Sequence, residues 1–220
     1  MVQIVGQLNK SEQESCRWRR RKEARPAEIL TAALKIFSLK GFAATRLTEV
    51  AKAAGVSKGT LYLYFESKEA LFKAVVNEFI LPQIAKAEEQ AEDYQGSIKG
   101  LLMTLAENWR CNVLETDVSG ISKIIMAEAS NFPELAQFYM QNVIQRSRAF
   151  MVSLIKLGIE RGEFRECNPQ HVARTFLAPM VFSAIWKNSL APFDEDYDTN
   201  DFLDFTIDNF MRGILKDKQT

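Results

Sequence analysis

Residues 46–72 read RLTEVAKAAGVSKGTLYLYFESKEALF, and this stretch decides the fold of the N-terminal part of the chain. Val50 and Ala51 lie on the inner face of a first short helix, where apolar residues recur at helical spacing. Gly55 follows the last periodic residue, where a helix commonly ends in a left-handed conformation. Ser57 then supplies a side-chain oxygen for the free N–H groups of a second helix. The stretch therefore predicts a helix-turn-helix.

The second of these helices carries polar groups that suit DNA. Lys58 can donate to guanine, and Thr60 can hydrogen-bond a base or touch a thymine methyl group. Tyr62, Tyr64 and Lys68 carry donors suited to phosphate oxygens, which fix the register without reading the sequence. Two plainer interpretations stay open: the tyrosines as half-buried core residues, and the lysines as solvated surface. The pattern favours a recognition helix for the major groove.

Two blocks of sequence carry a resemblance to a known family. They are GVSKGTLYLYFESKEAL at residues 55–71 and an upstream block at residues 29–45 that contains Phe37 and ends in GFAAT. Over about residues 26–75 the chain resembles the N-terminal domain of TetR-type (tetracycline-repressor) regulators. This resemblance implies an all-helical homodimer that binds operator DNA and releases it when a small molecule enters the C-terminal domain.

By position, the resemblance assigns DNA contact to eight residues. They are Arg46, Thr48, Lys58, Gly59, Thr60, Tyr62, Tyr64 and Lys68. The chain departs from the family at the start of the first of the two helices, where many relatives carry paired Thr or Ser. Here Thr45 is followed by Arg46, so it stays open which of Thr45, Arg46 and Thr48 meets phosphate.

Charge is divided unevenly along the chain, although the net charge is zero. Residues 1–73 hold 14 Lys and Arg against 7 Asp and Glu, whereas residues 74–220 hold 14 against 21. Attraction to phosphate requires basic charge beside the motif. We therefore predict a DNA-binding domain at residues 26–73 and an effector-binding and dimerisation domain at residues 74–220. A basic flexible arm at residues 1–25 either enters the minor groove or forms a solvated tail.

The remaining sequence keeps helical periodicity and shows no alternation typical of strands, which predicts an all-α fold of about nine helices. Three small helices form the basic domain, and the first of them occupies residues 26–41. The helices of the larger domain are expected at about residues 67–93, with a break at Pro82, and at 97–109, 121–129, 133–161, 169–190 and 199–215.

The last two long helices are candidates for a dimer interface. Each carries apolar residues around much of its girth, so each must bury more than one face. The plainer interpretation places both helices at the centre of the monomer, but in the family that the chain resembles they form the dimer. The candidate interface residues are Phe176, Met180, Phe202, Phe205 and Phe210.

An effector cavity is expected in the larger domain. Flexible methionine with aromatic walls suits an apolar or aromatic ligand. The candidates lie on apolar faces of different expected helices: Met103, Trp109, Met126, Phe150 and Met180. Methionine and aromatic residues at helical spacing also form ordinary core, and that interpretation stays open. Nothing in the sequence identifies the effector.

Other classes of function find little support. The single histidine, His171, leaves no His-based metal cluster, and there is no Gly-rich phosphate loop and no Cys/His metal spacing. Three scattered cysteines indicate a reduced cytoplasm, and the longest uncharged apolar stretch, residues 175–186, is too short to span a bilayer. We expect a cytoplasmic regulator that is not an enzyme and has no cofactor, metal or membrane partner. The alternative is a DNA-binding regulator controlled by a protein partner.

Overall fold

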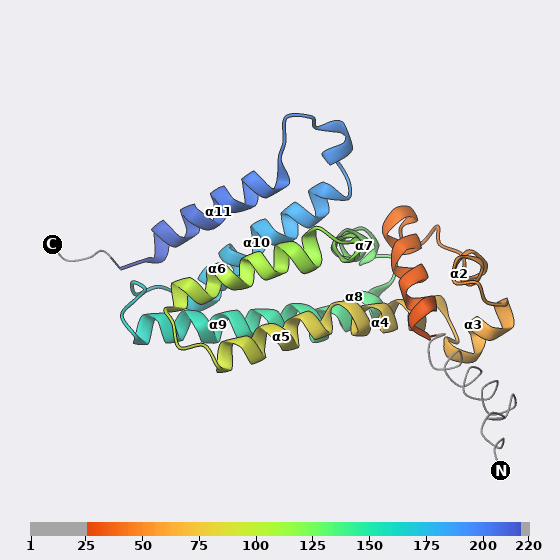
Figure 1. The fold of residues 1–220 in the computed structure, drawn as a ribbon, viewed down its shortest axis with the longest axis horizontal. Coiled ribbons are helices and arrows are strands. Elements are labelled where there is room, and N and C mark those ends of the chain that lie inside the picture. The colour runs from red at the N-terminus through yellow and green to blue at the C-terminus, as the bar shows by residue number, and fades with distance from the viewer. Residues whose placement is uncertain (1–25, 217–220) are drawn as a thin grey trace, which may run out of the picture.

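The computed structural model describes residues 26–216, and the regular secondary structure in this range is helical (Figure 1). An isolated bridge between Phe164 and Leu215 is the only β-type pairing in the same range. The expected basic arm at residues 1–25 lies outside the described residues. Residues 26–40 form the first helix. The later helices are α2 (Leu47–Ala53), α3 (Lys58–Tyr64), α4 (Lys68–Phe79), α5 (Leu81–Glu92), α6 (Ile98–Trp109), α7 (Gly120–Glu128), α8 (Pro133–Tyr139), α9 (Gln145–Glu160), α10 (Pro169–Lys187) and α11 (Thr199–Ile214).

Several of these helices run on into one another. α4 and α5 meet at Ile80, α6 continues into the π-helical turn η1 (Arg110–Leu114), and η3 (Met140–Ile144) joins α8 to α9. Counted as continuous rods, the helices between residues 26 and 216 number nine, which confirms the predicted all-α fold. Pro82 lies in the first turn of α5, where its missing N–H costs no helical hydrogen bond.

Local turn chemistry sets the ends of the short helices as the sequence predicts. Gly55 has φ of +65°, the left-handed conformation that glycine adopts at little cost. The Ser57 hydroxyl accepts from the Thr60 N–H at 3.0 Å at the start of α3. Ser67 does the same for the Ala70 N–H at 3.0 Å at the start of α4. Both caps satisfy N–H groups that a helix leaves unpaired at its first turn.

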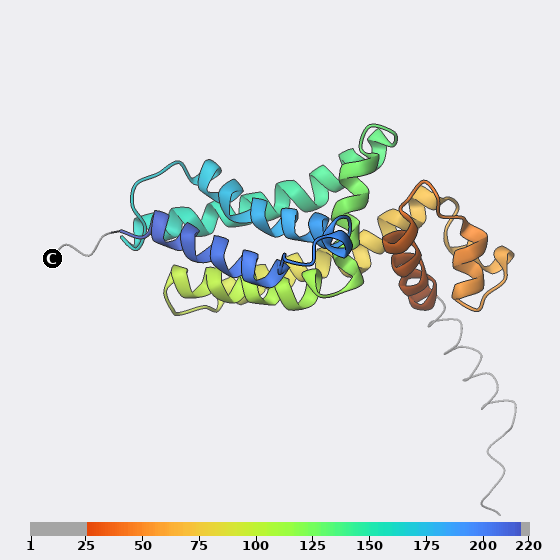
Figure 2. The same ribbon diagram turned by 90° about the horizontal axis from the view of Figure 1, so that it is seen from above.

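The helices form a small body and a longer bundle. The first helix packs with α2 and α3 at one end of the molecule, and α5 to α11 form the bundle beside it (Figures 1 and 2). One hydrophobic core contains Phe37 and Phe72 from the small body together with Ile125 and Tyr139 from the bundle. The expected domain boundary at residue 73 therefore falls inside α4, and the core crosses it.

A second core occupies the far end of the bundle. It is built mainly from α6, α9, α10 and α11. Phe176 of α10 and Phe210 of α11 meet in it edge to face, with ring centroids 5.1 Å apart. Because α10 packs against both α9 and α11, it is the central helix of this part of the bundle.

Candidate nucleic-acid interface and interior cavity

α3 presents a free outer face at the end of the molecule (Figure 1). Its inner residue Leu61 is fully buried, whereas Tyr62 is 44% exposed and Leu63 is 84% exposed. Lys58 and Gly59 are also exposed, and the Lys58 ammonium lies 5.6 Å from the centroid of the Tyr62 ring. Leu63 is a further candidate contact, because a large apolar side chain at this exposure suits a thymine methyl group. Its signal in the sequence is its place two residues after Leu61, which turns it away from the core.

The two remaining predicted residues of α3 are half-buried. The Thr60 hydroxyl lies 2.9 Å from that of Ser57, so part of its hydrogen-bonding capacity is used within the cap. Tyr64 packs against the core of the small body, and its ring centroid is 6.5 Å from that of Phe65. Of the two tyrosines, Tyr62 is therefore the exposed one, and Tyr64 fits the half-buried interpretation.

The start of α2 narrows the choice among Thr45, Arg46 and Thr48. Thr45 is buried, and its hydroxyl donates to the Gly41 carbonyl at 2.7 Å. This bond closes the turn that follows the first helix. Arg46 and Thr48 are exposed, and Arg46 makes no side-chain cap bond to α2. These two residues remain as the phosphate candidates at this helix.

Lys68 departs from its predicted role. Its ammonium donates to the carbonyls of Phe42, Ala43 and Thr45 at 2.8, 3.1 and 3.3 Å, and lies 4.6 Å from the centroid of the Phe42 ring. A lysine ammonium has three N–H donors, and all three are used here. The carbonyls lie in the turn between the first helix and α2, outside the hydrogen-bond ladders of both helices. Lys68 thus ties α4 to the turn before α2, and because its three donors are used within the protein we do not include it among the proposed phosphate contacts.

The small body is held against the bundle by a compact contact. The Ser38 hydroxyl donates to the Asp117 carbonyl at 2.8 Å, and the rings of Phe42 and Phe132 meet edge to face with centroids 4.7 Å apart. Gly120, at the start of α7, allows this approach, because a Cβ atom there would lie 1.8 Å from the Ser38 hydroxyl oxygen. The Ala43 N–H also donates to a carboxylate oxygen of Glu128 at 3.2 Å.

A cavity of about 760 Å³ lies in the bundle, among α5, α6 with η1, α7, the continuous rod from α8 through η3 to α9, and α10. Its walls are mostly apolar. Four of the five predicted ligand residues line it, namely Trp109, Met126, Phe150 and Met180. Met103 does not line the cavity and is exposed, which corrects the prediction for this residue. The reason is helical register: α6 buries Leu102 and Leu105, and Met103 points to the opposite side.

The cavity walls also carry polar groups that the sequence reasoning missed. Burial raises the pKa of Tyr139 to about 12, a rise that a hydrogen bond with Ser122 partly offsets, so the phenol stays neutral. Gln90 accepts from the Asn108 amide at 2.8 Å. The cavity also receives three basic side chains, Lys86, Arg148 and Arg174. A charged residue within a helical pattern does not indicate a cavity position, because most charged residues on helices are solvated.

Three of the five predicted interface residues are buried inside the single chain, which corrects that prediction. Phe176 is 1% exposed and Phe210 is 8% exposed, and Met180 is also buried. These residues complete the core between α10 and α11. Phe202 is half-buried, and only Phe205, at 67% exposure, is freely available to a partner. The apolar girth of these helices is explained largely by packing within the monomer.

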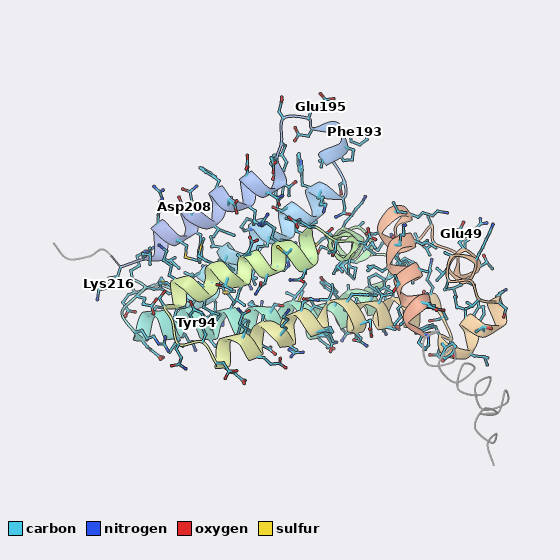
Figure 3. The ribbon with its side chains drawn as sticks, viewed as in Figure 1. Glu49, Tyr94, Phe193, Glu195, Asp208 and Lys216 are labelled. Atoms are coloured by element: carbon cyan, nitrogen blue, oxygen red, sulfur yellow. The ribbon has the colours of Figure 1, made fainter. Side chains whose placement is uncertain are left out.

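Some apolar surface nevertheless remains on α10 and α11. Val181 and Phe182 of α10 are exposed, and the ring of Phe182 lies 5.6 Å from that of Phe202 on α11. α11 is the outermost helix of the bundle in Figure 1. Asp208 projects outward from it, and Phe193 and Glu195 stand in the loop that precedes it (Figure 3). The two helices thus present an apolar strip with charged residues beside it.

Two further kinds of site were sought among residues 26–216. No group of three or more His, Cys, Asp or Glu residues there could hold a metal ion. No helix in the same range has the length and apolar character needed to cross a membrane.

Two family models match the chain. The model described as "Bacterial regulatory proteins, tetR family" matches residues 29–75. The model described as "Tetracyclin repressor-like, C-terminal domain" matches residues 93–199. Together they cover more than half of the chain, and the first contains the helix-turn-helix while the second contains α6 to α10 of the bundle.

Relatives and solved structures agree with these models. The HTH-type transcriptional regulator YfiR of Bacillus subtilis (strain 168) is 30% identical over 177 residues, which are 80% of this chain and 84% of the relative. A putative transcriptional regulator from Saccharomonospora viridis, solved in complex with choline, has a TM-score of 0.74 at 17% identity and covers 89% of this chain and 99% of its own. FadR from Bacillus subtilis, solved with stearoyl-CoA, has a TM-score of 0.70 at 20% identity, with coverage of 86% and 98%. Both structures share the fold of this chain.

Proposed function

The chain belongs to the TetR family of bacterial transcriptional regulators, and we propose that it binds palindromic operator DNA as a homodimer and leaves it when a small effector occupies the cavity. The main observation in favour is a shared core. Leu61, which holds α3 in place, belongs to the same hydrophobic cluster as Ile84, Ile125 and Tyr139, which line the cavity. A change in the cavity therefore has a packed route to the recognition helix.

The route runs through α4. Ile80, at the junction of α4 and α5, lines the cavity, and Lys68, at the other end of α4, is bonded to the turn before α2. A ligand that fits the cavity better in one position of α4 shifts the population toward that position. The ligand acts only through its difference in affinity between the two states, so bound DNA and bound ligand weaken each other reciprocally.

Arg46 and Thr48 would meet phosphate, whereas Lys58, Gly59 and Thr60 at the start of α3 would approach base edges. These residues begin the two helices of the motif and are exposed or half-exposed. Tyr62 and Tyr64 complete the proposed set, with Tyr62 the more accessible. Recognition helices of a symmetric dimer must lie about 34 Å apart to enter successive major grooves. Operator binding of this kind takes place in the bacterial cytoplasm.

The proposed dimer uses the apolar strip of α10 and α11. Phe182 and Phe205 are its most accessible large side chains, and a two-fold axis would pair the strip with its copy. Phe205→Asp and Phe182→Asp are expected to yield monomers of native helicity in light scattering and circular dichroism. Phe210→Asp serves as a contrast, because it introduces a charge into the monomer core and should lower stability instead. A dimer that survives both surface variants would exclude this strip.

A small-molecule effector is favoured over control by a protein partner because the bundle contains a cavity rather than a solid core. Apolar walls with aromatic side chains suit an apolar or aromatic compound. Two neighbours of the same fold were solved in complex with choline and with stearoyl-CoA, so proteins of this fold bind chemically different ligands.

The test of operator binding is selection of genomic fragments by the purified full chain. We expect recovery of fragments that share a palindrome, and a Lys58→Ala, Tyr62→Ala double variant should lose them. Lys156→Ala is the matched control, because Lys156 is an exposed lysine of α9 in the bundle. Failure of the native chain to enrich any palindromic sequence at low salt would contradict the proposal.

A further inference from the structure

The charge of the cavity walls is opposite to that of the domain that contains them. Residues 74–220 hold 21 Asp and Glu against 14 Lys and Arg. Among the described residues, however, the cavity is lined by Lys86, Arg148 and Arg174 and by no Asp or Glu. An acidic domain that turns only basic side chains into its cavity indicates a site for negative charge.

None of these three basic side chains has a hydrogen-bond or ion-pair partner among the described residues. Arg146 and Arg148 both belong to α9, but they differ sharply. The Arg146 guanidinium donates to both carboxylate oxygens of Glu88, at 3.0 and 2.5 Å. Within residues 26–216, neither the Arg148 nor the Arg174 guanidinium makes a hydrogen bond or an ion pair. Arg148 is half-buried, so its charge is partly removed from water. Partial burial of an unpaired charge is unfavourable, and a bound anion would compensate for it.

The two arginines line the cavity from neighbouring helices. They come from α9 and α10, which pack side by side. Arg174 is exposed and Arg148 is half-buried, whereas the apolar lining residues Ile84, Leu105 and Met180 are buried. Basic side chains set among mostly apolar walls match a molecule with a charged head and an apolar body.

We propose that the cavity binds an amphiphilic anion, with a carboxylate or phosphate head between Arg148 and Arg174 and an apolar body against Trp109, Phe150 and Met180. A guanidinium suits both heads, because its fork of donors matches two oxygens at once. Free long-chain carboxylic acids and coenzyme A thioesters of the same acids share this chemistry. The inference rests on the proposed role of the cavity as the effector site.

The test is direct binding of four probes to the full-length native protein by calorimetry, without DNA. The probes are decanoate, decanoyl-CoA, methyl decanoate and decyltrimethylammonium. We expect saturable binding of at least one anionic probe, and at least about tenfold weaker binding of the neutral ester and the cation. Tighter binding of decanoate would identify a free acid as the source, and tighter binding of decanoyl-CoA a thioester. Equal or stronger binding of the ester or the cation, or no binding of either anion, would overturn the inference.

Matched variants locate the head group. Arg148→Met and Arg174→Met keep an unbranched apolar stem and remove the charge, and each should weaken binding of the anionic probe about tenfold or more. Arg148→Lys and Arg174→Lys should recover part of the affinity. Lys156→Met, an exposed position of α9 outside the cavity, should change nothing. Unchanged affinity in both methionine variants, with native helicity, would also refute the site.

Release from the operator by a ligand and binding of an amphiphilic anion are separate proposals, and different results would contradict each of them. If decanoate or decanoyl-CoA binds but the operator complex persists at saturation, the ligand class stands and the release mechanism is wrong. If the operator complex forms and an uncharged or cationic compound dissociates it, the release mechanism stands and the anionic site is wrong.

Discussion

The helix-turn-helix and the cavity are both built from helices, but they are encoded in different ways. The recognition helix and its turn lie within 14 consecutive residues, 51–64, whose caps are satisfied by near neighbours. The cavity collects its walls from five helices between residues 80 and 185. A local motif depends on few contacts, each readable from its spacing. A cavity depends on how several helices are rotated against one another, so its lining changes if any one of them turns.

The two regions are linked by Phe42, and its loss should have the largest effect. Phe42 is fully buried, and its ring lies within 5.6 Å, between centroids, of Phe37, Phe72 and Phe132. Phe42→Ala should lower the free energy of unfolding by about 3–5 kcal/mol through lost burial and a new cavity. Urea unfolding followed by circular dichroism measures this. Phe193→Ala, at a side chain that is 85% exposed, should change it by less than about 0.5 kcal/mol. Equal losses of unfolding free energy in the two variants would show that Phe42 does not hold the small body against the bundle.

Substitutions of Lys68 and Lys58 distinguish effects on stability from effects on DNA binding within the small body. Lys68→Ala removes charge-assisted hydrogen bonds to three carbonyls and should lower the free energy of unfolding by about 1.5–3 kcal/mol. Lys58→Ala should leave stability unchanged, weaken operator binding by about 1–3 kcal/mol and relax specificity at the base that Lys58 contacts. Denaturation and a salt titration of operator affinity test the pair. A Lys68→Ala protein of native stability with a reduced salt slope would restore Lys68 as a phosphate contact.

A substitution at Gly120 tests the contact between the small body and the bundle without changing a residue of the helix-turn-helix or of the cavity lining. A Cβ atom there would lie 1.8 Å from the Ser38 hydroxyl oxygen and 2.8 Å from its Cβ atom. Gly120→Ala should therefore cost about 1–3 kcal/mol of stability through overpacking. The double variant with Ser38→Gly should recover part of this loss, which a double-mutant cycle in urea measures. Simple additivity of the two substitutions would show that they do not meet.

Ser57 provides the smallest and most local change. Ser57→Ala removes the cap of α3 and should cost about 1 kcal/mol, since a capping hydroxyl contributes about 0.5–2 kcal/mol. Thermal unfolding measures the loss, and Ser57→Asn should restore most of it. Ligand binding in the cavity should stay unchanged in both variants, because the cap lies outside the cavity lining. Weaker ligand binding by the Ser57→Ala variant would mean that the cavity and the helix-turn-helix are coupled through α3.

Predictions from sequence succeeded where one residue reports on its near neighbours. The cap at Ser57 and the left-handed Gly55 follow from local spacing, and the structure confirms both. Predictions failed where a long helix offers more than one place to bury an apolar face. Phe176 and Phe210 are as apolar as an interface requires, but they pack against each other. Nothing in their spacing separates these two destinations.

The sequence by itself determined the all-helical fold, the helix-turn-helix and the family, because these depend on periodicity, caps and a contiguous motif. Tertiary structure alone decided that Lys68 bonds a turn rather than faces solvent, that Met103 points away from the cavity, and that Arg148 points into it. The physical reason is common to all three. A side chain's partners depend on the rotation and placement of helices distant in the chain, and a local pattern of residues contains no record of that geometry.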